Sequence, residues 1–288
     1  MTEHQVLVMG LPKTGKTTFI AALWDVVEME KVSGSLVLDG VDGNQQHLNE
    51  IRDAWADCRE LSRTLVGKEK ILSMTLKDRT SGTKGRIALP DMDGEAFERQ
   101  WTERAWPKSH KEITEGSDSA LLFIHPAKVK SGALIRDTQR TVAVLTEETP
   151  VPKPQTSGAP EAAKKFTPTQ VQLVELLQFV RWVKQGLSDF RLGVIVSAWD
   201  VVMKQGKNTP EQWLQAQLPM LHQFLAANRE SISSRVYGVS AQGGDIVKDA
   251  AKLRKKNTPS ERIIVVEGTV QSSDITIPVR WVMGMPDG

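Results

Sequence analysis

One short segment of this chain has the residue types and spacing of a phosphate-binding loop. Residues 10–17 read GLPKTGKT, a complete match to the pattern GxxxxGK[ST]. Glycines let a backbone turn so that successive N–H groups point at an anion, and a helix that follows adds the positive end of its dipole. The Lys16 ammonium would reach the β- and γ-phosphates, and the Thr17 hydroxyl would take one position on Mg²⁺. The segment therefore predicts a nucleoside phosphate site, with expected contacts from Gly10, Lys13, Thr14, Gly15, Lys16, Thr17 and Thr18.

The residues on either side of this loop supply the structural context that it needs. Residues 6–9 form a short apolar run typical of a buried strand, and apolar residues recur at helical spacing from Phe19 to Val27. A strand, a loop and a helix in this order are what the motif requires. The alternative, a glycine-rich turn that contains a lysine by chance, does not explain both flanks.

A second motif, Asp91-Met-Asp-Gly94-Glu95, ends a predicted strand. In a DxxG arrangement Asp91 would hold Mg²⁺ through water, and the Gly94 N–H would meet the γ-phosphate. The alternative is an acidic turn that merely follows a strand.

Two further strand ends carry residues suited to a purine base. The segment VIVSAWD ends at Asp200, whose carboxylate would accept the N1–H and 2-amino groups of guanine, donors that adenine does not offer. A helix-capping aspartate is the alternative. The segment VSAQGG places Ser240 and Ala241 where a backbone N–H would contact the guanine O6.

The order of these four motifs resembles the GTPase series of the TRAFAC class, to which Ras-like proteins belong, from about residue 4 to 245. More narrowly, GLPKTGKTTFIAALW, SAWD and ERIIV…DITIPVRWVM resemble the double-GTPase-type domains of bacterial conflict and defence systems. The resemblance implies a three-layer P-loop fold that binds GTP or GDP with Mg²⁺. It also implies slow GTP hydrolysis, with a GTPase-activating or effector protein reading the nucleotide state.

The chain departs from the usual pattern of that class in its base motif. The usual [NT]KxD is Ser197-Ala-Trp-Asp200 here, so the lysine that packs along the base is missing and Trp199 is the candidate replacement.

The hydrolytic residues also depart from that pattern. Glu95 stands where Ras-like proteins carry a glutamine, and a carboxylate beside a triphosphate is electrostatically unfavourable. Thr64 is the candidate effector-loop threonine, with Arg59 or Arg63 as an arginine finger from the same chain. Lys13 occupies the position of an asparagine that helps to hold potassium in some relatives, so its ammonium would replace the ion; a solvated lysine is the alternative. The candidate catalytic residues are Lys16, Lys13, Glu95 and Thr64.

Strands alternate with helices along the chain, which predicts an α/β fold with a mostly parallel central sheet, one antiparallel hairpin strand and helices on both faces. The strands are expected at 6–9, 34–39, 70–78, 84–94, 119–126, 190–200, 234–244 and 261–268. Helices are expected after the phosphate loop and at 44–64, 95–106, 132–147, 167–186, 209–228 and 274–284. We interpret 1–288 as a single GTPase domain with an exposed, proline-rich insertion at 127–168 and a C-terminal extension at 245–288.

Composition excludes several other classes of protein. A net charge of +2 indicates no nucleic-acid site, and a single cysteine, Cys58, excludes a disulfide framework or a thiolate zinc site. No apolar run has membrane-spanning length and no signal peptide is evident, so we expect a cytoplasmic protein without membrane contact. Self-association remains open. The competing functions are a GTP-hydrolysing switch, a nucleotide-binding scaffold with little turnover, and a P-loop ATPase or kinase.

Overall fold

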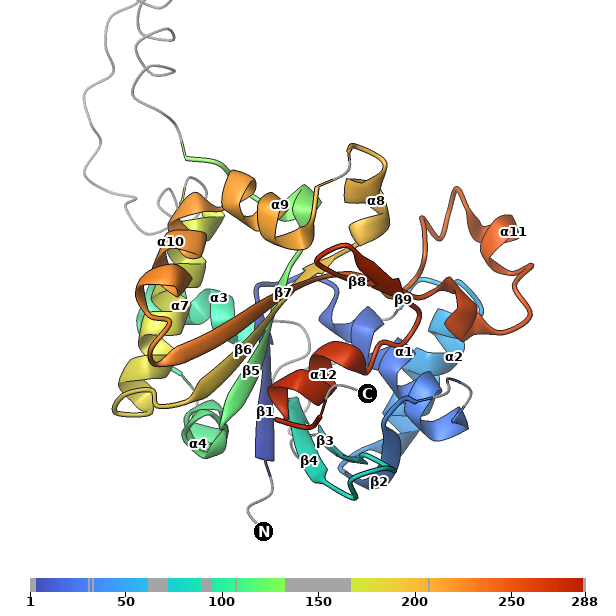
Figure 1. Ribbon diagram of the computed structural model, residues 1–288, viewed down its shortest axis with the longest axis horizontal. Helices are drawn as coiled ribbons and strands as arrows, with labels where there is room; N and C mark the ends of the chain where they lie inside the picture. Colours follow the sequence, from blue (N-terminus) through green and yellow to red (C-terminus); the bar gives the residue numbers. More distant parts are fainter. Residues whose placement is uncertain are drawn as a thin grey trace, which may run out of the picture.

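The structure, a computed structural model, describes residues 4–30, 32, 34–61, 72–89, 95–106, 108–132, 167–206 and 208–286. Its described strands form one nine-stranded sheet in the order β2-β3-β4-β1-β5-β6-β7-β8-β9 (Figure 1). The strands are β1 His4–Gly10, β2 Val37–Asp42, β3 Leu72–Lys77, β4 Lys84–Leu89, β5 Ser119–Ile124, β6 Phe190–Ser197, β7 Ile232–Ser240, β8 Ile264–Glu267 and β9 Val270–Ser272.

Helices occupy both faces of this sheet. The α-helices are α1 Lys16–Met29, α2 Gln45–Ala56, α3 Glu95–Glu103, α4 Lys108–Gly116, α7 Thr169–Val183, α8 Trp199–Met203, α9 Pro210–Gln217, α10 Pro219–Ala227, α11 Ala250–Leu253 and α12 Ile277–Val282. Two short 3₁₀ helices are η1 Pro126–Lys128 and η2 Pro259–Arg262.

The five central strands β4, β1, β5, β6 and β7 pair in parallel, so their carboxyl ends lie along one edge of the sheet. Antiparallel strands extend the sheet at both of its edges. At one edge β2 pairs with β3 and β3 pairs with β4, and at the other β7 pairs with β8 and β8 pairs with β9. Parallel strands collect the loops that follow them at a common edge, which is where α/β proteins bind ligands. The α/β prediction is confirmed, although the structure has more antiparallel pairing than the single predicted hairpin strand.

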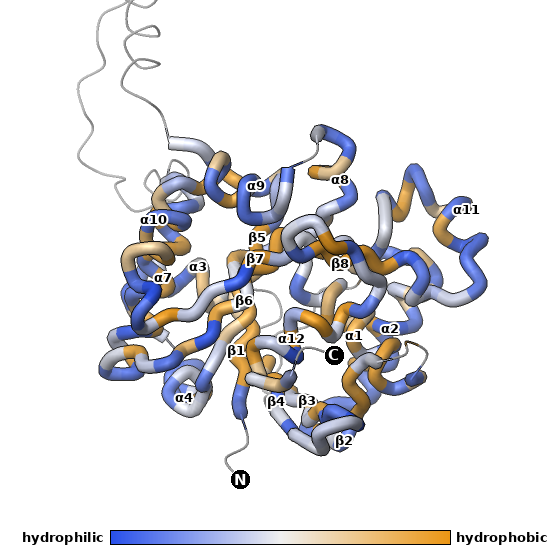
Figure 2. Tube along the Cα trace, viewed as in Figure 1, coloured by the Kyte–Doolittle hydropathy of each residue, from blue (hydrophilic) through white to orange (hydrophobic). Residues whose placement is uncertain are grey.

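Alternating side chains of the central strands belong to two separate hydrophobic cores, one on each face of the sheet. In β1, Val6 and Val8 belong to the core under α1, α2 and α12, whereas Leu7 and Met9 belong to the core under α7 and its neighbours. Because successive side chains of a strand point to opposite faces, a strand buried on both sides is apolar throughout. Figure 2 shows this apolar centre, and the two cores make the three layers of the fold.

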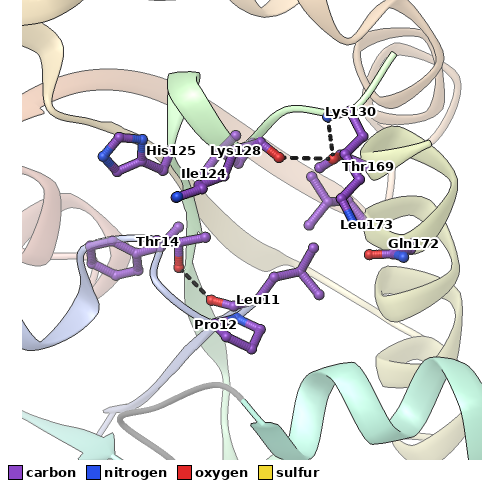
Figure 3. A pocket seen from close by; sticks show the side chains of 11 residues that line it. Leu11, Pro12, Thr14, Ile124, His125, Lys128, Lys130, Thr169, Gln172 and Leu173 are labelled. Atoms are coloured by element: carbon purple, nitrogen blue, oxygen red, sulfur yellow. Dashed lines mark hydrogen bonds between the residues drawn. The ribbon is translucent and has the colours of Figure 1, made fainter. Parts of the chain in front are cut away.

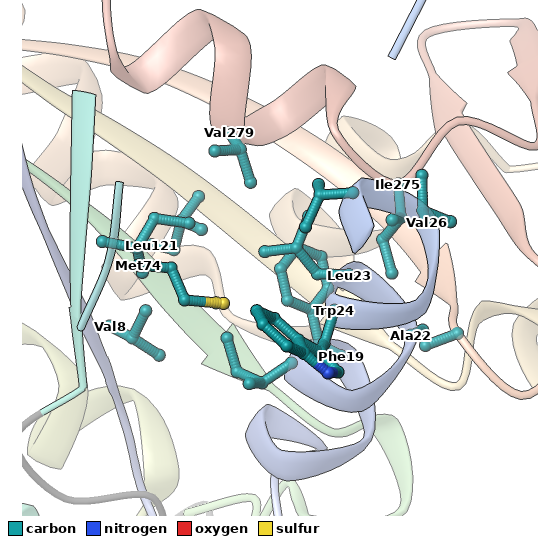
Figure 4. Close-up of a cluster of buried hydrophobic side chains, with 14 of the residues drawn as sticks. Val8, Phe19, Ala22, Leu23, Trp24, Val26, Met74, Leu121, Ile275 and Val279 are labelled. Carbon is teal, nitrogen blue, oxygen red and sulfur yellow. The ribbon is translucent and has the colours of Figure 1, made fainter. Parts of the chain in front are cut away.

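Helix α1 is buried along most of its length, which fixes the loop that precedes it. Phe19, Leu23 and Trp24 are at most 1% exposed and pack with β-strand residues such as Val8 and Leu121 (Figure 4). The Trp24 Nε1 donates to Asn49 Oδ1 of α2 at 2.9 Å. The loop at residues 10–15 is therefore held between a central strand and a buried helix.

Several predicted elements differ from those observed. The predicted helix 209–228 is two helices, because Pro219 has no N–H for an intrahelical bond and its ring crowds the preceding turn. The predicted helix 44–64 already ends at Ala56, where the chain leaves through Cys58 at a φ of +53°. The predicted strand 34–39 lies at Val37–Asp42. The predicted strand 190–200 already ends at Ser197, and Trp199 and Asp200 begin helix α8. Helices α4, α8 and α11 and strand β9 were not predicted. The predicted helix 132–147 lies outside the described residues.

The two ends of the predicted insertion lie side by side. The Lys130 N–H donates to Thr169 Oγ1 at 2.8 Å, and the Thr169 N–H donates to the Lys130 carbonyl at 3.0 Å. The described residues that border 133–166 therefore meet at one point of the fold. Among the described residues, no helix is both long and apolar enough to cross a membrane.

A buried ion pair connects α12 to the β3–β4 hairpin. The Arg280 Nη1 lies 2.9 Å from Asp78 Oδ2, and the two side chains are 7% and 5% exposed. The Arg280 Nη2 also donates to the Gly34 carbonyl at 2.5 Å. One guanidinium therefore joins three segments that are distant in the sequence.

Replacing Arg280 with methionine should lower the free energy of unfolding by about 3 kcal/mol, because Asp78 would stay buried without its cation. Burial raises the pKa of Asp78, but the Thr80 N–H, the Ser81 hydroxyl and Arg280 together lower it below its usual value. The stabilisation is thus present above the unfolded-state pKa of about 3.9 and is lost as the pH falls below it. Urea unfolding at pH 7 and at acidic pH measures both effects.

Arg79→Met is the matched control, because Arg79 pairs with Glu30 on the surface, where both side chains are more than half exposed. We expect a change within about 0.5 kcal/mol for the control. Equal losses in the two variants would contradict a special role for the buried pair.

Candidate functional site

The predicted phosphate loop joins β1 to α1 and fits closely against two neighbouring strands. A Cβ on Gly10, whose φ is +148°, would lie 2.7 Å from the Phe123 carbonyl oxygen of β5. A Cβ on Gly15, whose φ is +89°, would lie 3.1 Å from the Ser197 Cβ of β6. Gly10 therefore requires glycine for conformation and for space, and Gly15 requires it chiefly for conformation.

The N-terminus of α1 has the features of an anion site. Gly15 is the N-cap residue, and neither a side-chain cap nor an acidic residue occupies the first turn. The first backbone N–H groups of a helix have no intrahelical partners and carry positive potential. Thr17 and Thr18 follow in this first turn, both partly exposed. The loop can therefore receive a phosphate on backbone donors, as the motif predicts.

Lys16 and Thr14 stabilise the loop from within. The Lys16 Nζ donates to the carbonyls of Gly10 and Leu11 at 2.9 and 3.0 Å, and the residue is 2% exposed. The Thr14 hydroxyl donates to the Leu11 carbonyl at 2.8 Å. Lys13 lies at the exposed apex with a φ of +61°. The two lysines therefore differ: one ammonium is held inside the loop and the other faces solvent.

A pocket of about 150 Å³ opens between this loop and the ends of β6 and β7. Asp200, Ser240 and Ala241 line it together with Gly15 and Thr18, so the structure brings the predicted base residues next to the phosphate loop. The remaining lining residues are Phe19, Phe123, His125, Ile195, Ser197, Ala198, Val239, Gln242 and Gly244. We call this cavity the base pocket.

Asp200 is positioned by β7 and does not cap a helix. Ala198 is the N-cap residue of α8, and Asp200 lies within its first turn. The Asp200 Oδ1 accepts a hydrogen bond from the Ser240 hydroxyl at 2.5 Å, while Ser240 Oγ accepts from the Gly243 N–H at 3.1 Å. The carboxylate is thus fixed at the pocket wall, 8% exposed, and the capping alternative does not apply.

Trp199 does not replace the missing lysine of the base motif. Its side chain is 1% exposed and packs on β7, where a Cβ on Gly238 would lie 2.2 Å from the indole. The residue that lines the base pocket at this turn is Ala198, in the left-handed region at a φ of +47°. Of the two possibilities for Trp199, the structure supports the one in which it does not supply the stacking surface of the missing lysine.

His125 is a pocket residue that the motifs missed. It directly follows β5, and its Nδ1 accepts a hydrogen bond from the Ala127 N–H at 3.2 Å, which leaves the proton on Nε2. Burial, and then the charge of Lys128, lower the pKa of His125, while Asp200 opposes the shift. The imidazole is therefore neutral at pH 7. Its place after a buried central strand was the signal that could have revealed it.

Trp55 of α2 is a second missed residue. Its Nε1 donates to the Ala241 carbonyl at 3.0 Å, and the side chain is fully buried. The Gln242 side chain donates back to the Trp55 carbonyl at 3.4 Å. Helix α2 therefore supports the loop after β7 that forms one wall of the base pocket.

A second pocket, of about 160 Å³, adjoins the loop at Leu11, Pro12 and Thr14 (Figure 3). Its other walls come from residues after β5, including Lys128 and Lys130, and from the start of α7. The lining includes no carboxylate. Lys128 and Lys130 therefore add positive charge on the side of the phosphate loop that faces this second pocket.

Several predicted site residues cannot be placed. Asp91, Gly94, Thr64 and Arg63 lie outside the described residues, and Glu95 is described only as the first residue of α3. Arg59 is described, and its guanidinium pairs with Asp57 at 3.1 Å beside α11 rather than lining the base pocket. The structure thus does not bring Arg59 to the phosphate loop.

Comparison with known proteins identifies one family model, Double-GTPase 1, which matches residues 7–282. No curated protein matches the sequence.

Solved structures with a similar chain path include a nucleolar GTP-binding protein 1 from Plasmodium falciparum, with 12% identity, TM-score 0.38, and coverage of 88% of this chain and 84% of that one. A bacterial selenocysteine-specific elongation factor, EF-Sec, shows 14% identity and TM-score 0.38, with coverage of 88% and 28%. Era from Aquifex aeolicus, bound to GDP and AlF4⁻, shows 13% identity and TM-score 0.32, with coverage of 90% and 58%. The chain therefore spans less than two thirds of the last two.

Lys16→Met should lower the affinity for nucleoside triphosphates by at least about a hundredfold, because a charge-assisted contact to phosphate is lost while the aliphatic stem stays. Lys108→Met is the matched control: it removes the same charge from α4, where the side chain is 90% exposed, and it should leave the affinity unchanged. Binding of a fluorescent nucleotide measures both, and thermal unfolding checks the fold. An affinity of Lys16→Met within about threefold of wild type, roughly 0.6 kcal/mol, would contradict the phosphate-loop assignment.

Proposed function

Because this chain belongs to the Double-GTPase 1 family, a family of GTPases, we propose that it binds GTP and GDP in the base pocket and phosphate loop and hydrolyses GTP slowly. The proposal rests chiefly on one observation: a fixed, buried carboxylate, Asp200, shares a cavity with the uncapped N-terminus of α1. Phosphates and a purine base would thereby be recognised by neighbouring walls of a single site.

The hydrogen-bonding chemistry of Asp200 supports guanine over adenine. One of its oxygens already accepts from Ser240, and a carboxylate oxygen can accept more than one hydrogen bond. Guanine offers two adjacent donors, N1–H and the 2-amino group, whereas adenine offers an unprotonated N1 at the same edge. A buried carboxylate facing an acceptor would lose its solvation without compensation. Guanine selectivity follows from that penalty.

The described residues also suit a nucleotide-bound Mg²⁺. Mg²⁺ is usually held by few protein oxygens together with substrate phosphates and water, and it neutralises phosphate charge when bound. Thr17 supplies a hydroxyl in the first turn of α1, next to the expected phosphates. Asp91 remains the candidate for the second contact. Lys16 would exchange its loop carbonyls for phosphate oxygens and so keep the ammonium solvated by oxygen.

We further propose that the nucleotide state is read by a protein partner within a bacterial multi-component system, with defence as one setting. A ladder of aromatic rings supports such a surface. Phe97 of α3, which directly follows the DMDG motif, contacts Trp106, with 6.0 Å between ring centroids. Trp106 contacts Phe179 at 4.9 Å, and Phe179 contacts Trp182, which is 68% exposed. The ladder connects the end of the second motif to an exposed ring on α7.

A nucleotide-binding scaffold with little hydrolysis is the second candidate. The sequence favours it at one position, because Glu95 stands in place of a water-orienting glutamine. Single-turnover hydrolysis of GTP by the purified protein, with and without Mg²⁺, distinguishes the two candidates. A rate no faster than that of free GTP supports the scaffold and contradicts the switch.

Asp200→Asn should weaken GTP binding by about 2–4 kcal/mol, because an amide cannot accept from both guanine donors. The amide N–H₂ can instead donate to the 2-oxo group of xanthine, so binding of xanthosine triphosphate should improve. Competition with a fluorescent GTP analogue measures both affinities. Glu230→Gln, a neutralised exposed carboxylate, is the control and should change neither affinity. Unchanged GTP affinity in Asp200→Asn would remove Asp200 from base recognition.

Lys13→Asn should slow GTP hydrolysis by about ten- to a hundredfold in Na⁺, because the ammonium would no longer neutralise charge between the β- and γ-phosphates. Potassium should restore part of that rate, whereas the wild-type rate should be indifferent to exchange of Na⁺ for K⁺. Single-turnover measurements in the two salts test this. An unchanged rate in Lys13→Asn would show that the exposed lysine only faces solvent.

A further inference from the structure

A separate pocket lies behind the base pocket, between the end of α2 and the segment that contains α11 and η2. Its volume is about 380 Å³, within the size range of small-molecule sites. We call it the anion pocket; it is lined by Ala56, Asp57, Arg59, Leu253, Arg254, Lys256, Pro259 and Arg262. Figure 1 shows α11 and α2 on the same side of the molecule.

The lining carries four cationic side chains and a single carboxylate. That carboxylate, Asp57, pairs with Arg59 at 3.1 Å. Among the described residues, no carboxylate lies within ion-pair distance of Arg254, Lys256 or Arg262. The lining therefore carries an excess of three positive charges.

The hydrogen bonds of Arg254 and Arg262 leave their charges in place. The Arg254 guanidinium donates to the Asp57 carbonyl at 2.9 and 3.1 Å. The Arg262 guanidinium donates to the carbonyls of Trp55 and Ala56 at 2.9 and 3.1 Å. These carbonyls end α2, and a helix C-terminus offsets only about half a unit charge. Capping of α2 thus explains the orientation of both arginines but not the accumulation of charge.

Arg262 is the most unusual member of the group. It is 4% exposed, its guanidinium carbon lies 4.8 Å from the centroid of the Trp55 ring, and its Nε has no hydrogen-bond partner. Burial lowers the pKa of Arg262, while the nearby Cys58 and Asp25 act in the opposite direction, and the guanidinium also donates to Cys58 Sγ at 2.7 Å. An arginine keeps its charge at neutral pH. A largely buried cation is costly unless it is fully compensated, and an anion close by would offset part of that cost.

We propose that the anion pocket binds a small phosphorylated molecule. Arg254 and Lys256 present exposed donors at the pocket, while Arg262 contributes positive potential from beneath. Guanidinium and ammonium groups together suit the charge and the several oxygens of a phosphate. Leu253 and Pro259 add apolar surface beside these donors. The ligand is either an inorganic phosphate or the phosphate group of a small organic molecule.

The pocket also adjoins the loop after β7. A Cβ on Gly243 would lie 2.3 Å from the Arg262 carbonyl oxygen, and Trp55, on which Arg262 stacks, donates to the Ala241 carbonyl. The phosphorylated ligand would therefore bind on the reverse side of a wall of the base pocket, at a site distinct from the phosphate loop.

Calorimetric titration with pyrophosphate tests the proposal on protein saturated with GDP, at constant ionic strength. The variant Arg254→Ala/Lys256→Ala should lose affinity by at least about tenfold, because two charge-assisted donors are removed. The matched control Lys252→Ala/Lys255→Ala removes the same charge from the same segment, but neither residue lines the pocket. It should stay within about twofold of wild type.

Lys256→Ala alone, which breaks no hydrogen bond within the described chain, should show a smaller loss in the same direction. Adenosine monophosphate and inorganic phosphate then distinguish the two ligand sources: tighter binding of the nucleotide indicates an organic phosphate, and equal binding an inorganic one. Equal losses in the two double variants would show general surface attraction and overturn the proposal. Failure of pyrophosphate to bind the wild-type protein would overturn it as well.

Discussion

The close approach of the phosphate loop to the ends of β5 and β6 is the constraint on which the candidate site depends. A Cβ on Gly10 would clash with the Phe123 carbonyl, and one on Gly15 would lie tightly against Ser197, so the backbone of the loop packs closely on both strands. This contact places the N-terminus of α1 beside the turn that carries Asp200. Because buried strands and a buried helix hold both partners, the backbone of this part of the site is fixed before a ligand binds. Preorganisation of this kind reduces the entropic cost of ligand binding.

The elements at the sheet edges support this centre from both sides. Helix α2 reaches the base pocket through Trp55, and α12 holds the β3–β4 hairpin through Arg280 and Asp78. The hairpin ends at β4, and the DMDG motif follows it in the sequence. The site thus combines a compact parallel centre with contacts from segments more than 180 residues away in the sequence.

Local signals predicted the phosphate loop, the central strands and the position of Asp200, because glycine conformation, apolar runs and strand ends act over a few residues. Pro219 is also a local signal, because proline interrupts a helix. The prediction of a single helix at 209–228 did not take it into account. The orientation of Trp199 could not be predicted, since it depends on the space above Gly238 on another strand. The contact from Trp55 to Ala241 also depends on tertiary packing. The sequence of α2 shows an apolar stripe, which does not identify the residue that Trp55 contacts. The anion pocket likewise joins residues about 200 positions apart.

The central claim is that one cavity recognises both guanine and the phosphates. Calorimetric titration of the purified wild-type protein with GTP and with ATP, both with Mg²⁺, tests it most directly. The account predicts one GTP per chain and binding of ATP weaker by at least about a hundredfold, the size of the penalty for a buried carboxylate that faces an acceptor. Equal affinities for the two nucleotides would contradict it.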